Sequence, residues 1–183
     1  MTQTDTQLML RTGTPPAPGN LALLEGFLNT WSGELDIEEF GTVSETERWL
    51  RQFGLWTGRK KLTSGNQKKI IDFRQNLRAW VLEESSTEPL AASLSDAAFH
   101  AEIDDGNLSF RPMGDGYQFL VGSLAKAISE SQNAGTWDRF KCCELPTCGW
   151  AFYDSTRSRT KRWCSMKTCG SRHKAREYYR RKR

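Results

Sequence analysis

Four cysteines near the end of the chain have a spacing that suits metal binding. Four residues separate Cys143 from Cys148 and Cys164 from Cys169, and fifteen residues lie between the two pairs. Thiolates in two such pairs can converge on a single tetrahedral Zn²⁺ ion. Cys142 directly precedes the first pair and could replace Cys143 with a gap of five residues. The spacing therefore predicts one structural zinc ion, held by four of these five thiols.

Positive charge is concentrated in the same part of the chain. Residues 139–183 contain 14 Lys or Arg and 3 Asp or Glu, a net charge of +11. The other residues contain 12 basic and 19 acidic side chains, a net charge of −7, so the whole chain carries +4. Four thiolates around a divalent ion contribute only about −2. The asymmetry predicts a polyanionic partner for the C-terminal part alone.

Composition narrows the class of protein. The chain has no apolar stretch of about 18 residues, so we expect no membrane span. Residues 1–20 lack a basic start followed by an apolar block, so we expect no signal peptide. All five cysteines fall between residues 142 and 169, which favours metal binding over the scattered disulfides of a secreted protein. We therefore expect a cytoplasmic protein, associated with the nucleoid.

The residues around the cysteines predict a small fold nucleated by metal. Residues 149–154 indicate an aromatic-rich strand, residues 155–160 a basic turn, and residues 161–163 a returning strand. Ser165 is placed to cap a helix that carries Cys169 in its first turns. A knuckle, a hairpin and a helix with ligands at its start form a treble clef. Because its core is so small, metal binding should supply much of its folding free energy.

The preceding part of the chain is predicted to be mainly helical. Apolar periodicity indicates helices near residues 21–31, 66–84, 90–99 and 120–133. Ser44 to Glu47 fits a capping box, which starts a further short helix that ends near Gly54. Residues 103–110 predict a small hairpin that turns at Asp104–Asn107. The predicted fold class is α+β: a mainly helical N-terminal domain with a small β-hairpin, followed by a C-terminal treble-clef zinc finger.

The predicted boundary lies between Asn133 and Thr136, where Gly135 ends the last helical pattern. Residues 1–19 are rich in Pro and Gly and are expected to be a flexible N-terminal segment. Residues 20–134 are expected to form the N-terminal domain, and residues 137–183 the zinc finger.

The C-terminal residues resemble a bacterial family in which a CGNR-type zinc finger follows an ABATE domain. The segments that carry the resemblance are 143–150 (CELPTCGW), 152–154 (FYD), 162–166 (RWCSM) and 169–172 (CGSR), with Lys174. The N-terminal part is similar more loosely, through Leu28-Asn29-Thr30, Trp49-Leu50 and Gly54-Leu55. Ser171 stands where the family has Asn, and we expect this change to affect a local hydrogen bond rather than the metal.

The resemblance favours Cys143 over Cys142 and so selects the predicted zinc ligands, which are Cys143, Cys148, Cys164 and Cys169. It implies a transcription regulator whose N-terminal domain, 20–134, senses a signal, with a role in stress responses. The ligand-binding residues of that domain are unknown, and the partners to consider are a small-molecule effector and a second copy of the chain.

The basic residues divide into a group on the predicted turn and a group on the final helix. Both can neutralise phosphates of double-stranded DNA. The predicted nucleic-acid contacts are Arg157, Arg159, Lys161, Arg162, Lys167, Arg172, Lys174, Arg176 and Arg180. Among the aromatic residues, Trp150 and Trp163 are expected in the core of the finger, whereas Tyr178 and Tyr179 are candidates for contact with phosphate or a partner.

Catalysis finds little support in the sequence. The chain has two histidines, His100 and His173, and a treble-clef nuclease would need more than one near the finger. We therefore expect a zinc-dependent DNA-binding transcription regulator that is not an enzyme. The alternatives are an RNA- or ribosome-associated zinc finger and an adaptor that binds an acidic protein.

Overall fold

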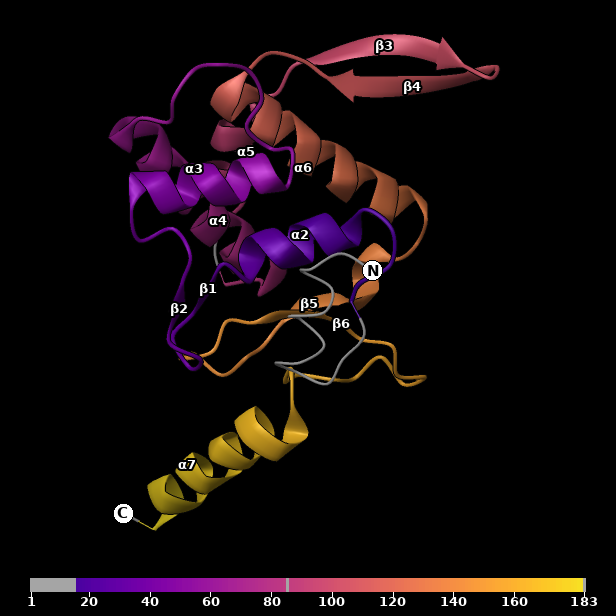
Figure 1. Cartoon of the computed structure of the whole chain (residues 1–183). Helices are drawn as coiled ribbons and strands as arrows, with labels where there is room; N and C mark the ends of the chain where they lie inside the picture. Colours follow the sequence, from indigo (N-terminus) through magenta and orange to yellow (C-terminus); the bar gives the residue numbers. More distant parts are fainter. Residues whose placement is uncertain (1–15, 85, 183) are drawn as a thin grey trace.

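The computed structural model describes residues 16–84 and 86–182 of the chain, which combine helices with three two-stranded antiparallel sheets. In chain order the elements are α2 Leu21–Leu28, β1 Trp31–Ser32, β2 Ile37–Glu38, α3 Val43–Gln52, α4 Ser64–Val81, α5 Glu88–Leu94, β3 Phe99–Asp104, β4 Asn107–Pro112, α6 Gly116–Asn133, a 3₁₀ turn Trp137–Arg139, β5 Phe140–Cys142, β6 Ala151–Tyr153, a π-helical turn Met166–Gly170 and α7 Ser171–Arg181. Helices α2 to α6 pack together, β5 and β6 lie beneath them, and α7 projects away at the C-terminal end (Figure 1). This mixture agrees with the predicted fold class in outline.

The core lies between α2, α4 and α6. Helix α4 contributes Ile70, Phe73 and Leu77, whose spacing places them on one face of the helix. Phe27 of α2 packs against Phe73 with ring centroids 6.0 Å apart, and Leu124 of α6 is also fully buried. The helical periodicity of the sequence therefore identified the faces that meet in the core.

Several of the predicted helix boundaries are wrong. Helix α2 ends at Leu28 rather than Trp31, which begins β1, and α6 begins at Gly116 rather than Leu120. The cap of α3 is Thr42 rather than Ser44, because the Thr42 hydroxyl accepts a hydrogen bond from the Glu45 backbone N–H at 3.2 Å. Helix α5 ends at Leu94 rather than Phe99, where β3 already begins. Phe99 leaves the helix because its backbone pairs with Pro112 across the hairpin.

Residues 16–19 are tied to the helices. Ala17 is buried, and its backbone N–H donates to Glu25 Oε2 at 2.6 Å. These contacts attach residues 16–19 to α2, whereas residues 1–15 lie outside the described residues, so the flexibility predicted for residues 1–19 stays a prediction.

The cysteine-rich part of the chain packs directly against α2 and α4. Phe140, Cys142 and Ala151 belong to the same buried cluster as the helices. Asn29, just after α2, substitutes for a neighbouring strand: its Nδ2 donates to the Ala151 carbonyl at 3.0 Å, and its Oδ1 accepts from the Ala151 N–H at 2.7 Å. The division into two domains stays a prediction, because residues on both sides of it share one core.

A buried arginine makes a second connection. Arg78 of α4 donates to the carbonyls of Gly149 (3.0 Å) and Leu28 (2.5 Å), and its guanidinium lies 4.8 Å from the centre of the Trp31 ring. Gly149 has φ +60°, and a Cβ at this position would lie 2.7 Å from the Trp31 ring. Only glycine fits this approach without displacing the aromatic ring.

Replacing Asn29 tests the connection through β6. Asn29→Ala removes both partners of the buried Ala151 backbone, and each unsatisfied group costs roughly 1–3 kcal/mol. We expect urea denaturation to show a free energy of unfolding lower by about 2–4 kcal/mol. Asn133→Ala, at the exposed end of α6, is the matched control, and an equal loss in both variants would contradict the assignment.

Candidate metal centre

The four predicted cysteines come together at one point. Their sulfur atoms all lie within 4.8 Å of one another, and all four residues are buried. Cys164 Sγ lies 3.7 Å from Cys148 Sγ and 3.6 Å from Cys169 Sγ. Sulfurs bound at about 2.3 Å to a tetrahedral Zn²⁺ would be separated by about 3.8 Å. Cys143, Cys148, Cys164 and Cys169 are therefore positioned to bind one metal ion.

Hydrogen bonding within the cluster shifts the pKa values of Cys143, Cys148 and Cys164 in opposite directions. Hydrogen bonds from the Cys148 and Cys164 thiols, together with the backbone N–H groups of Leu145 and Cys164, lower the pKa of Cys143. The pKa of Cys148 and that of Cys164 are raised, first of all by their hydrogen bonds to Cys143. One sulfur thus favours the thiolate while its neighbours are hindered from ionising beside it. A divalent cation removes this conflict because it stabilises all four as thiolates.

Two turns position the ligands. In the first, the Cys148 N–H donates to the Leu145 carbonyl at 2.8 Å, and the Cys143 N–H donates to the Trp150 carbonyl at 2.8 Å. In the second, the π-helical turn Met166–Gly170 carries Cys169 immediately before α7. Ser165 occupies the predicted cap position, but its side chain makes no capping hydrogen bond there.

The fifth cysteine belongs to the helical core and not to the metal centre. Cys142 is 3 % exposed and packs with the residues of α2 and α4. Burial raises the pKa of this thiol to about 12. The choice of Cys143 over Cys142 as a ligand is therefore confirmed.

The predicted hairpin of the finger pairs differently from the expectation. Residues 151–153 form β6 as predicted, but its partner is β5, Phe140–Cys142, rather than residues 161–163. Residues 161–163 form no strand, and Arg162 contributes one backbone hydrogen bond, as acceptor of the Glu144 N–H at 3.1 Å. The reason is that β5 is held against the buried helices and so offers β6 a partner with an apolar face.

The aromatic residues around the centre take the places predicted for Trp150 and Trp163. Trp150 is 2 % exposed and packs with the four cysteines, and Trp163 lies half-buried beside them. His173 of α7 contacts the Trp163 ring, with ring centroids 5.3 Å apart. His100 is exposed on β3, at the opposite end of the molecule (Figure 1).

The nine predicted nucleic-acid contacts differ in how free their charges are. Within residues 16–84 and 86–182, six of them form no ion pair: Arg157, Arg159, Lys161, Lys167, Lys174 and Arg176. Arg162 pairs with Glu144, Arg172 with Glu34 and Arg180 with Glu177. The structure thus places four of the nine residues on the loop 155–162, Lys167 in the π-helical turn and the other four on α7.

A buried aspartate anchors the basic loop, residues 155–162. The predictions from the sequence had not singled out this residue. Asp154 accepts hydrogen bonds from the Thr156 N–H at 3.0 Å, the Lys141 Nζ at 2.9 Å and the Lys161 N–H at 2.9 Å. Burial alone raises the pKa of its carboxyl, but these hydrogen bonds outweigh burial and hold the pKa well below its ordinary value. Aspartate followed two residues later by threonine is a recognised turn signal that could have indicated this role.

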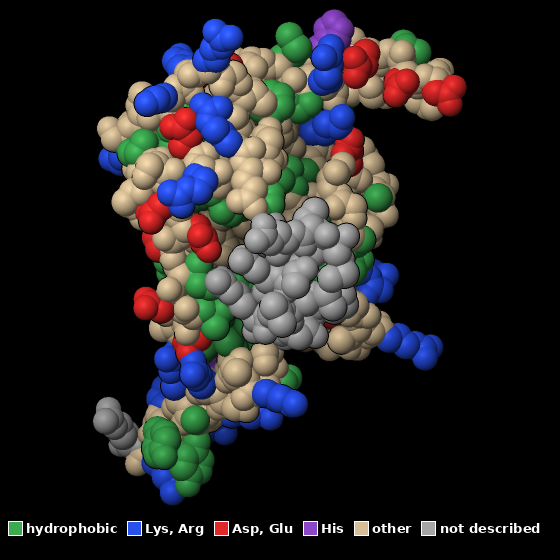
Figure 2. All heavy atoms as spheres, viewed as in Figure 1, with side chains coloured by type: hydrophobic (Ala, Val, Ile, Leu, Met, Phe, Trp, Pro, Cys, Tyr) green, Lys and Arg blue, Asp and Glu red, His purple; other side chains and the backbone are tan. Residues whose placement is uncertain are grey.

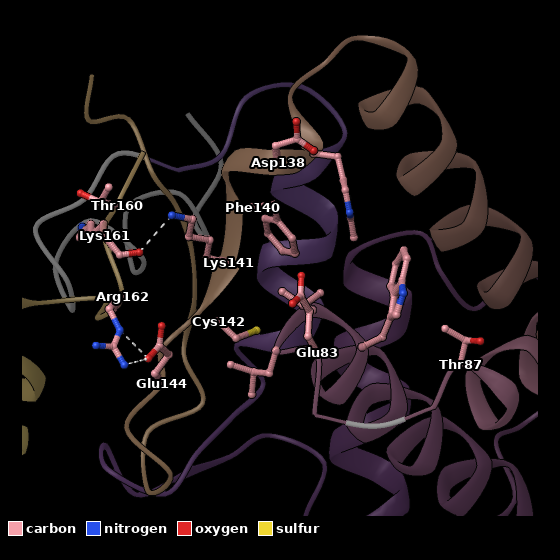
Figure 3. A pocket seen from close by; sticks show the side chains of 14 residues that line it. Glu83, Thr87, Asp138, Phe140, Lys141, Cys142, Glu144, Thr160, Lys161 and Arg162 are labelled. Atoms are coloured by element: carbon pink, nitrogen blue, oxygen red, sulfur yellow. Dashed lines mark hydrogen bonds and ion pairs between the residues drawn. The ribbon is translucent and has the colours of Figure 1, made fainter. Parts of the chain in front are cut away.

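A pocket lies between the end of α4 and the surface of the finger. It has a volume of about 750 Å³, and the residues that line it include Trp80, Glu83, Trp137 and Arg162. Figure 3 shows the Arg162–Glu144 ion pair along one wall and Cys142 at the base, between finger and helices.

The C-terminal part of the chain matches a known family. Residues 139–182 match the sequence model of the CGNR zinc finger family. No curated protein matches the chain significantly. Among the described helices, none is long and apolar enough to cross a bilayer.

Removal of a ligand tests the metal centre. We expect elemental analysis to find one zinc per chain in the wild type and almost none in Cys148→Ser, because three thiolates leave the tetrahedral site incomplete. Cys142→Ala is the control and should keep its zinc, since Cys142 lies outside the sulfur cluster. Zinc loss from Cys142→Ala with retention in Cys148→Ser would contradict the ligand assignment.

Acid tests the role of Asp154. Because its pKa is lowered in the folded chain, its contribution to stability is present above the unfolded pKa of about 3.9 and is lost as pH falls further. In Asp154→Asn the partly exposed Lys141 ammonium loses its charged partner, which should cost roughly 1–3 kcal/mol at neutral pH. The difference in urea unfolding between this variant and the wild type should shrink below pH 4, and a constant difference would refute the role.

Proposed function

We propose that the chain is a zinc-dependent, DNA-binding transcription regulator whose basic loop and α7 bind the DNA. One observation carries the proposal. Helix α7 has no buried residue, projects from the body and presents cations next to the metal centre (Figure 1). A helix of this kind can enter the major groove of B-DNA, which is wide enough to admit one. We assign the finger to the treble-clef class as part of the same proposal.

The acidic residues of the C-terminal part do not neutralise this surface. Its three acids, Glu144, Asp154 and Glu177, each already pair with a single cation. Lys167, Lys174 and Arg176 are exposed and keep their charges free among the described residues. In Figure 2 the charged side chains around α7 at the lower end of the molecule are blue, whereas blue and red side chains are mixed over the helical part. The charges thus favour approach of a polyanion from the α7 end.

Two tyrosines extend this surface beyond the charges. Tyr178 is 53 % and Tyr179 68 % exposed, and their rings contact each other at a centroid distance of 5.6 Å. A phenolic hydroxyl can donate to a phosphate oxygen, a contact that fixes register without reading sequence. We therefore assign these tyrosines to the phosphate-contacting set.

The N-terminal part would transmit a signal to the finger. The pocket between α4 and the finger is the place where a small-molecule effector would touch both, because Trp80 comes from α4 and Arg162 from the finger. Glu34 makes a direct link between the two parts, since it pairs with Arg172 at the start of α7 and accepts a hydrogen bond from Thr147 at 2.7 Å.

Salt dependence tests the DNA proposal. Affinity for a duplex should fall steeply with salt, because each phosphate neutralised by Lys or Arg releases counterions. Arg176→Ala should reduce the magnitude of the slope of log K against log salt by about 1. Lys68→Ala removes the same charge from an exposed position on α4 and should leave the slope unchanged. Equal slopes in both variants would contradict a site on α7.

Competition separates DNA from the alternative partners. With zinc-loaded protein on labelled duplex DNA, unlabelled duplex should compete better than structured RNA of equal length. Preference for the RNA would favour the RNA- or ribosome-associated alternative. If Arg172→Glu and Arg176→Glu together weakened an acidic protein complex but spared DNA affinity, the adaptor function would replace the proposal.

A further inference from the structure

The β3–β4 hairpin has one face made entirely of apolar residues. Residues paired across antiparallel strands share a face, and successive pairs lie on opposite faces. The cross-strand pairs of the apolar face are Phe99 with Pro112, Ala101 with Phe110, and Ile103 with Leu108. The other face is polar and includes an ion pair in which Arg111 Nε lies 3.4 Å from Glu102 Oε2.

This apolar face is left largely uncovered by the described part of the chain. Ile103 is 71 % exposed, Leu108 62 %, Phe110 50 % and Phe99 41 %. The hairpin projects from the helices (Figure 1) and is held at its base, where Pro112 lies against Gly122 of α6. An isolated two-stranded hairpin is marginally stable in water, and contiguous exposed apolar surface usually marks an interaction site.

We propose that this face packs against the same face of a second copy of the chain, around a two-fold axis. A self-complementary surface is what a two-fold interface requires, because each copy presents the same residues to the other. The face carries no charge, so it matches neither a nucleic acid nor a charged protein surface. Packing apolar face on apolar face also leaves the Glu102–Arg111 ion pair in water on the outer side.

Charge at the tip of the hairpin selects one arrangement of the two copies. The turn carries Asp104 and Asp105, both exposed. A parallel arrangement would place the four carboxylates of the two tips together, whereas an antiparallel one sets each tip over the base of the other hairpin. Like-charge repulsion therefore favours antiparallel packing.

The size of the face predicts a weak dimer. Each of its four large side chains exposes roughly 100 Å², so a copy would bury about 400 Å² through them, below the roughly 800 Å² per partner of a stable interface. The dimer should therefore form and dissociate reversibly with protein concentration. Its consequence for the molecule is that two basic α7 helices are held in one assembly.

The oligomeric state of the zinc-loaded full chain, freed of nucleic acid, tests the inference. Sedimentation velocity over increasing protein concentration should shift the wild type from monomer toward dimer. Leu108→Lys places a charge in the apolar face and should keep the chain monomeric at concentrations where the wild type dimerises. Leu108→Ile, which retains the apolar surface, should dimerise like the wild type.

Asn107→Lys is the matched control, because it adds the same charge at the adjacent exposed position on the polar face. It should dimerise, and circular dichroism should show equal folding in all variants. A wild type that is monomeric at every concentration would overturn the inference. It would do so equally if the monomer were found to bind neutral lipid vesicles through this face. Equal loss of dimer in Leu108→Lys and Asn107→Lys would overturn it as well.

Discussion

Four sulfur atoms confined within 4.8 Å of one another form the constraint on which the C-terminal part depends. Hydrogen bonding favours ionisation of Cys143 and opposes that of its neighbours, so the cluster is complete only with a cation that compensates all four thiolates. The ligands come from two distant turns, and α7 begins directly after the second. Because α7 itself buries nothing, its direction is set by the metal centre and by the Trp163–His173 contact.

The finger in turn depends on the helical part. Asn29 satisfies both backbone groups of Ala151, and Arg78 donates to the Gly149 carbonyl two residues earlier in the same segment. These bonds are made in a buried setting, where an unmatched donor or acceptor is costly. A change in the helices that moved Asn29 or Arg78 would therefore move β6 and the knuckle that follows Cys143. Under the proposed function, a signal would pass from the helices to the finger through this junction.

Local sequence features predicted what is local in the structure. The cysteine spacing predicted a four-thiol site but left Cys142 and Cys143 as alternatives, between which the family resemblance chose correctly. The helical period of Ile70, Phe73 and Leu77 identified the buried face of α4, and Asp104–Asn107 marked the turn of the hairpin. Such signals could not predict which strands pair when they lie far apart in the sequence. The partner of β6 is β5 because the helical core holds β5 in place, and Cys142 points into that core rather than to the metal for the same reason.

The acidic charge of the helical part and the basic charge of the finger act together on a polyanion. An acidic helical part is repelled by a polyanion, whereas α7 and the basic loop are attracted to it, so the field orients the molecule with α7 foremost. Specific pairs limit this attraction: Glu34 holds Arg172, and Asp154 holds Lys141. The cations left free lie farther along α7 and on the loop, away from the junction. The Glu34–Arg172 ion pair, which links the start of α7 to the body, thus leaves the outer part of this helix available for a partner.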